Sequence, residues 1–224
     1  MMHDATLEAV LFDMDGVLCK SSPYIMEAAT HLFRDKYNVQ ITEDDFKDFA
    51  GSGETRYLRG IAERYDVDLD MPGDLDTLYV MYIHAIQGRL TALPGVFEFI
   101  DHCRKQPLPI ALATSAHEVK MHGNLREIGL PLSLFDAHVS GNDVTQPKPN
   151  PQIFEMAAQR LGIEPARCLA VEDSLNGVAS AKAAECFCLA VTTEFDRADL
   201  LAAGADWVAE DLSDIRLSHG QPAK

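Results

Sequence analysis

The chain contains short apolar runs that end abruptly in polar residues, and the first of them carries the strongest signal. Val10-Leu11-Phe12 stops at two aspartates, Asp13 and Asp15, and then at Gly16. Such a run is typical of a buried strand in a parallel sheet, and ligands of these sheets bind beyond the carboxyl ends of the strands. Side chains alternate along an extended backbone, so both carboxylates would lie on one side. We therefore expect Asp13 and Asp15 to face a site.

The pattern changes to helical spacing between about residues 20 and 90, where we predict no strand. Apolar residues recur every three or four positions over 24–33, 57–65 and 75–86. Acidic or glycine-bearing breaks separate these stretches at 42–45, 51–53 and 71–74. We predict a helical cap domain of residues 20–91, inserted into a core domain made of residues 1–19 and 92–224.

The second half of the chain alternates between the two patterns. We predict strands at 109–113, 137–139, 168–171, 187–191 and 206–209, helices at 96–105, 116–128, 151–161, 175–184 and 197–203, and a polar tail after about residue 216. Strands that alternate with helices at this spacing indicate the α/β class, with a doubly wound parallel sheet.

Two helix starts carry local signals. Ser115 and Glu118 have the spacing of a capping box for the helix at 116–128, which would leave Thr114 free at the strand end. Asn150 suits an N-cap, and Pro151 suits the first position of the helix at 151–161.

Composition narrows the class of partner. The 224 residues carry a formal charge of −16, which argues against sequence-independent binding to nucleic acid and against an anionic membrane surface. We expect a small-molecule ligand and a monomer. Five cysteines without zinc-like spacing favour free thiols in a reducing compartment, and the N-terminal residues lack a leader pattern, so we expect a cytoplasmic protein without a membrane span.

Residues suited to one reaction collect at the predicted strand ends. They are Asp13, Asp15, Thr114, Lys148, Glu172 and Asp173. A cluster of carboxylates suits a hard divalent cation, and Mg²⁺ usually takes one or two of them while it keeps positions for water and substrate phosphate. Lys148 and Thr114 would then hold phosphoryl oxygens. An EF-hand is excluded because Leu18 stands where its loop needs glycine.

Taken in order, these motifs resemble the haloacid dehalogenase-like superfamily, and within it the small-cap subfamily that includes β-phosphoglucomutase and many sugar-phosphate phosphatases. The resemblance covers residues 8–215. It is carried by four motifs: Asp13-Met-Asp15-Gly-Val-Leu, the strand-end Thr114, Lys148 in Lys-Pro-Asn-Pro, and Glu172-Asp173-Ser174-Leu-Asn-Gly177.

The resemblance implies a role for each residue. It makes Asp13 the nucleophile and Asp15 the general acid and base. It makes Thr114 and Lys148 a phosphoryl clamp. The implied ligands of Mg²⁺ are Asp173, Asp13, the backbone carbonyl of Asp15, and Glu172, which lies near the ion or acts through water. The first strand is expected between the strands that bear Thr114 and Asp173.

Substrate choice depends on the cap loop at residues 51–56. Glu54 stands where the mutases have an arginine that grips phosphate, and Ile25 stands where they have a histidine. We therefore expect substrate contacts from Thr114, Ser115, Lys148, Glu54 and Arg56, with Glu54 free to accept hydrogen bonds from sugar or polyol hydroxyls and Arg56 orienting it.

Three hypotheses remain. The first is a Mg²⁺-dependent phosphatase that acts on a small phosphorylated metabolite, a sugar or polyol monophosphate, through an aspartyl-phosphate. The second is a phosphomutase of the same fold. The third is a phosphoacceptor like a response-regulator receiver, which lacks a helical insertion after its first strand.

Overall fold

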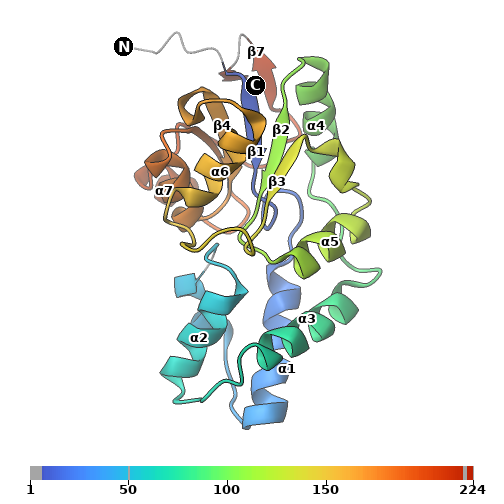
Figure 1. The fold of residues 1–224 in the computed structure, drawn as a ribbon, viewed down its shortest axis with the longest axis vertical. Coiled ribbons are helices and arrows are strands. Elements are labelled where there is room, and N and C mark those ends of the chain that lie inside the picture. The colour runs from blue at the N-terminus through green and yellow to red at the C-terminus, as the bar shows by residue number, and fades with distance from the viewer. Residues whose placement is uncertain (1–6, 50, 219–220, 224) are drawn as a thin grey trace.

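A six-stranded parallel sheet is the core of the fold and lies in the upper half of the view in Figure 1. The structure is a computed structural model that describes residues 7–49, 51–218 and 221–223. The strand order is β3-β2-β1-β4-β5-β6. Their bounds are β1 (Ala9–Phe12), β2 (Ile110–Ala113), β3 (Ala137–Val139), β4 (Cys168–Glu172), β5 (Phe187–Val191) and β6 (Trp207–Ala209). β1 lies between β2 and β4, the strands that precede Thr114 and Asp173, and the predicted doubly wound α/β fold is confirmed.

Side-chain alternation along β1 divides the core between the two faces of the sheet. Val10 and Phe12 join a cluster that includes residues of α4 (Val96–Lys105) and α5 (Glu118–Glu127). Ala9 and Leu11 join a second cluster with α6 (Gln152–Leu161), α7 (Leu175–Ala183) and α8 (Arg197–Ala202). Helices therefore cover both faces, which explains why the strands are almost continuously apolar.

The segment between β1 and α4 is helical, and no strand occurs among its described residues. It contains α1 (Ser22–Tyr37), the 3₁₀ helix η1 (Glu43–Phe49), α2 (Glu54–Arg64) and α3 (Gly73–Ile86). Figure 1 shows this group beyond the edge of the sheet at which β1 ends, with α1 and α3 packed together. α3 also contacts α5 of the sheet region. This arrangement supports our proposal that residues 20–91 act as a cap.

One predicted helix start is wrong. α5 begins at Glu118, and Ser115 does not cap it, since its hydroxyl donates to the Gly51 carbonyl oxygen instead. Asn142 accepts the Glu118 N–H at 2.8 Å and fills the capping role from another loop. α6 begins at Gln152, one residue later than expected, although the Asn150 side chain accepts the Gln152 N–H as a cap would.

The described part of the predicted polar tail contains two strands. Strands β7 (Arg216–Ser218) and β8 (Gln221–Ala223) pair antiparallel. Leu217 is buried, and its N–H donates to the ring of His102 on α4 at 2.9 Å. This hydrogen bond and the burial of Leu217 thus hold against the core a segment whose composition alone indicates a tail.

No helix of the described residues combines the length and the apolar character needed to cross a bilayer. The expectation of a cytoplasmic protein stays a prediction.

Candidate active site

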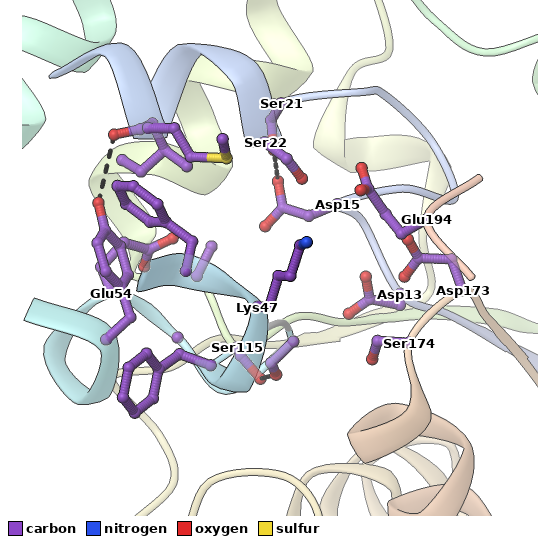
Figure 2. Close-up of a pocket in the computed structure, with 18 of the residues that line it drawn as sticks. Asp13, Asp15, Ser21, Ser22, Lys47, Glu54, Ser115, Asp173, Ser174 and Glu194 are labelled. Carbon is purple, nitrogen blue, oxygen red and sulfur yellow. Dashed lines mark hydrogen bonds between the residues drawn. The ribbon is translucent and has the colours of Figure 1, made fainter. Parts of the chain in front are cut away.

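A cavity of about 380 Å³ lies between the sheet and the helical segment. Figure 2 shows Asp13, Asp15 and Asp173 toward one side of it and Glu54 on the opposite side. Ser115, which follows β2, also lines the cavity. Thus residues from three strand ends and from α2 surround one space, as the positions of the strands in the sheet require.

Asp13 is fixed at the floor of this cavity. Its N–H donates to the Val171 carbonyl oxygen at 2.9 Å, which continues the pairing of β1 with β4 by one residue. Its Oδ1 accepts a hydrogen bond from Lys148 Nζ at 2.6 Å. Lys148 is buried behind the cavity and also pairs with Glu172. The lysine therefore holds the Asp13 carboxylate and offsets part of its charge.

Glu172 organises the turn that follows β4. One carboxylate oxygen binds Lys148, and the other accepts the Asp173 N–H at 3.0 Å and the Ser174 N–H at 3.3 Å. The Ser174 hydroxyl in turn caps α7 by accepting the Gly177 N–H at 3.0 Å. These bonds orient Asp173 toward the cavity that it lines.

The carboxylates of Asp13, Glu172 and Asp173 offer three ligand atoms within 4.8 Å of one another. Burial raises the pKa of Asp13 to about 7, although Lys148 opposes the rise. Burial and the neighbouring acids raise the pKa of Asp173 well above its usual range. When all three groups are ionised, three carboxylates face one ammonium, and two negative charges then lack compensation. An all-oxygen donor set with this charge fits a divalent cation such as Mg²⁺.

Asp15 is held by a different set of partners. Its Oδ2 accepts from Lys120 Nζ at 2.8 Å, and its Oδ1 accepts from Asn124 at 3.2 Å and from the Ser21 hydroxyl. About a quarter of its side chain, 26%, stays exposed. The carboxylate is thus fixed on several sides and still accessible from the cavity.

The side chains of Thr114 and Ser115 lie in different surroundings. Thr114 is fully buried at the end of β2, and its hydroxyl accepts the Ala116 N–H at 3.1 Å. Ser115 lines the cavity and reaches across to Gly51 in the cap loop. Only Ser115 of this pair is placed on the cavity wall.

The two cap-loop candidates are not brought together. Glu54 is buried, and its two carboxylate oxygens bind Lys120 at 2.8 Å and the Tyr79 hydroxyl at 3.1 Å. Arg56 is exposed and lines a second, adjoining cavity together with Arg59. The expectation that Arg56 orients a free Glu54 is wrong, because Lys120 occupies that place.

Sequence reasoning missed Lys120, Asn124 and Lys47. Lys120 and Asn124 stand four residues apart on the buried face of α5, and Lys47 of η1 lines the cavity (Figure 2). A polar pair at this spacing, within the face that also carries Met121 and Leu125, is the signal that could have identified the first two.

A family model described as haloacid dehalogenase-like hydrolase matches residues 7–185. The chain is 37% identical over 215 residues to Protein SUPPRESSOR OF QUENCHING 1, chloroplastic, of Arabidopsis thaliana, a match that covers 95% of this chain and 20% of that protein. It is 31% identical over 178 residues to the Phosphorylated carbohydrates phosphatase of Thermotoga maritima, covering 80% of this chain and 82% of the relative.

Among solved structures, CbbY from Rhodobacter sphaeroides in complex with phosphate is similar in fold. The TM-score is 0.83 at 23% identity, and the alignment covers 93% of this chain and 96% of that one. The chain therefore spans a fifth of the Arabidopsis relative and most of the other two.

Proposed function

The chain belongs to the haloacid dehalogenase-like hydrolases, and from that premise we propose that it is a Mg²⁺-dependent phosphatase of a small phosphorylated metabolite. The proposed substrate is a sugar or polyol monophosphate, cleaved through an aspartyl-phosphate on Asp13. The strongest support for this proposal is a cluster of charged side chains at the floor of the cavity: Asp13, Lys148, Glu172 and Asp173. A receiver-like phosphoacceptor does not fit the family or the helical insertion after β1.

The proposed first step transfers the phosphoryl group to Asp13. A carboxylate oxygen of Asp13 attacks phosphorus while the bond to the leaving oxygen breaks, and Asp15 donates a proton to that oxygen. The attack faces repulsion between like charges, about 4 kcal/mol per charge pair at 4 Å with an effective dielectric near 20. Lys148, at 2.6 Å from Asp13, opposes this repulsion.

The second step regenerates the enzyme. Asp15, now a carboxylate, takes a proton from water as the water oxygen attacks phosphorus, and inorganic phosphate leaves Asp13. Asp15 can serve both steps because its partners hold it at one place while part of it stays accessible from the cavity.

Asp13 and Asp173, with Glu172 beside them, are the residues that would hold Mg²⁺. When bound, the ion supplies Lewis-acid stabilisation of charge on the phosphoryl oxygens. Glu172 already bonds Lys148 and two backbone N–H groups, so its main part is to position Asp173.

A panel of phosphorylated sugars, polyols and nucleotides tests this proposal by release of inorganic phosphate. We expect hydrolysis of at least one hexose or polyol monophosphate with Mg²⁺ and none after chelation. Hydrolysis that is indifferent to the chelator, or no hydrolysis of any member, would contradict the proposal.

A phosphomutase is the alternative, and one observation favours it. Arg56 and Arg59 line a cavity of about 620 Å³ that shares Gly53, Glu54 and Ser115 with the main cavity, so a distal phosphate would find cations there. Glu54 lies on the same wall and repels such a group. We expect little conversion of β-glucose 1-phosphate to glucose 6-phosphate, even with the bisphosphate added. Following inorganic phosphate and glucose 6-phosphate in one reaction decides between a phosphatase and a phosphomutase. Isomerisation faster than hydrolysis would establish the mutase.

A further inference from the structure

Lys120 is a buried cation that bridges the two sides of the cavity. Its side chain is only 3% exposed, yet its ammonium lies 2.8 Å from Asp15 Oδ2 and 2.8 Å from Glu54 Oε1. Asp15 belongs to the sheet region, whereas Glu54 opens α2 of the helical segment. Burial works against the charge of Lys120, but these two carboxylates outweigh it and raise its pKa well above the usual range. The lysine therefore stays charged and pairs with both.

Further hydrogen bonds surround this bridge. Glu54 Oε2 accepts from the Tyr79 hydroxyl at 3.1 Å, and Asn124, one turn along α5 from Lys120, bonds both Asp15 and the Tyr82 hydroxyl. Tyr79 and Tyr82 both belong to α3. The network thus ties α5 to α2 and α3 at the point where Asp15 lies.

Resting on the proposed function, we infer that Lys120 is a positioning residue that holds the Asp15 carboxyl group where it meets the leaving oxygen of the substrate. Because Lys120 also pairs with Glu54, it holds Asp15 in this place only while the cap loop at residues 51–56 is docked. Lys120 touches neither phosphorus nor the leaving oxygen, and no proton passes to or from it. Its effect comes from orientation, since a proton donor works only within hydrogen-bond reach of the oxygen it protonates.

The leaving group of the substrate distinguishes a positioning role of Lys120 from a purely structural one. Loss of a positioning residue should lower kcat/KM only for substrates whose leaving oxygen needs a proton, whereas loss of a structural residue should lower it for all substrates. Glucose 6-phosphate releases an alkoxide that needs the proton of Asp15, whereas p-nitrophenyl phosphate releases a stable phenolate that does not. The value of kcat/KM reports events up to departure of the leaving group. Misplacing Asp15 should therefore lower kcat/KM for glucose 6-phosphate far more than for p-nitrophenyl phosphate.

The experiment measures kcat/KM for both substrates with the full chain and with Lys120→Met. We expect a loss of about 10²-fold for glucose 6-phosphate and a change of less than about tenfold for p-nitrophenyl phosphate. Asp15→Asn should reproduce this pattern. Lys182→Met is the matched control. Lys182 pairs with Asp206 at 2.7 Å and is not among the residues that line the cavity, so this change should leave both values unchanged.

Lys120→Met leaves the Asp15 and Glu54 carboxylates facing each other, so folding is checked by circular dichroism. If the variant does not fold, Lys120→Met combined with Glu54→Gln removes one of the two charges and should give the same pattern. Equal losses for the two substrates, or no loss for either, would overturn the inference while leaving the phosphatase assignment intact. Failure of the unaltered protein to hydrolyse any alkyl phosphate of the panel would instead overturn the proposed function, and this inference with it.

Discussion

Single residues in the candidate site are packed with little tolerance, and Gly16 is the clearest example. Its φ is +82°, a left-handed conformation that favours glycine. A Cβ atom placed there would lie 1.7 Å from Asp173 Oδ2. The glycine of the first motif therefore gives room to a metal-ligand candidate from another strand, and it also turns the backbone.

Gly16→Ala should destabilise the protein and raise its Mg²⁺ requirement, because Asp173 must move. Gly129→Ala is the matched control, since Gly129 has a similar φ of +71° and nothing within 4 Å of its Cβ position. The free energy of unfolding of the control should fall only by the strain of the left-handed conformation, about 1–2 kcal/mol. Thermal melting and Mg²⁺ titration of activity measure the two effects. Equal behaviour of the two variants would argue against a clash with Asp173.

The sequence indicates Asp13, Asp15 and Asp173 because each follows an apolar run, and strand ends of a parallel sheet meet at one edge. It does not indicate Lys120, because a lysine within a helix is ordinarily solvent-exposed. The spacing of Lys120 and Asn124 within the apolar face of α5 hints that both are buried, but their partners on α3 and at Asp15 depend on tertiary packing.

At the scale of elements, the start of α5 shows a long-range contact overriding a local motif. Ser115 and Glu118 have capping-box spacing, yet Ser115 bonds Gly51 and Asn142 caps the helix. The sequence predicts where the helix lies to within a few residues, but its capping partner comes from the loop after β3, 24 residues away. A local pattern cannot encode that proximity.

Asn142→Ala should therefore destabilise the protein by about 1 kcal/mol, the usual effect of losing a helix cap. Ser115→Ala should have the smaller effect, since the bond it loses is exposed at the loop. Chemical denaturation of both variants measures the difference. A larger loss for Ser115→Ala would restore the capping box and contradict the observed helix start.

In the molecule as a whole, part of the excess negative charge lies in the buried cluster where the reaction is proposed. The chain carries a formal charge of −16, and the buried cluster holds three carboxylates against Lys148. The doubly wound sheet and the early helical insertion could be read from periodicity. The contact of α3 with α5 could not, because it depends on how the helical segment docks.

The charge imbalance links stability to pH and to metal. Burial raises the pKa of Asp13 from 3.8 to about 7, so the folded state binds its proton more tightly than the unfolded state. Without metal, this contribution to stability is present below about pH 4 and is lost as pH rises through about 7, a cost on the order of a few kcal/mol. The proposed divalent cation, bound at the ionised cluster, would offset this cost.

Mg²⁺ should consequently raise the melting temperature more at pH 8 than at pH 5. Asp173→Ala, which removes a ligand candidate, should lose most of this gain at pH 8. Differential scanning calorimetry with and without Mg²⁺ measures it. A gain that is equal at the two pH values, or larger at pH 5, would contradict the metal assignment to these carboxylates.

Phosphate release by Asp13→Asn tests the covalent mechanism most directly, since Asp13 is the proposed nucleophile and an amide of the same shape preserves the packing. Asp143→Asn is the control, because that aspartate pairs with Arg160 away from the cavity. With Mg²⁺ and the best substrate of the panel, we predict that Asp13→Asn loses turnover by about 10³-fold or more while it stays folded, and that Asp143→Asn keeps it. Substantial turnover by folded Asp13→Asn would contradict the covalent mechanism.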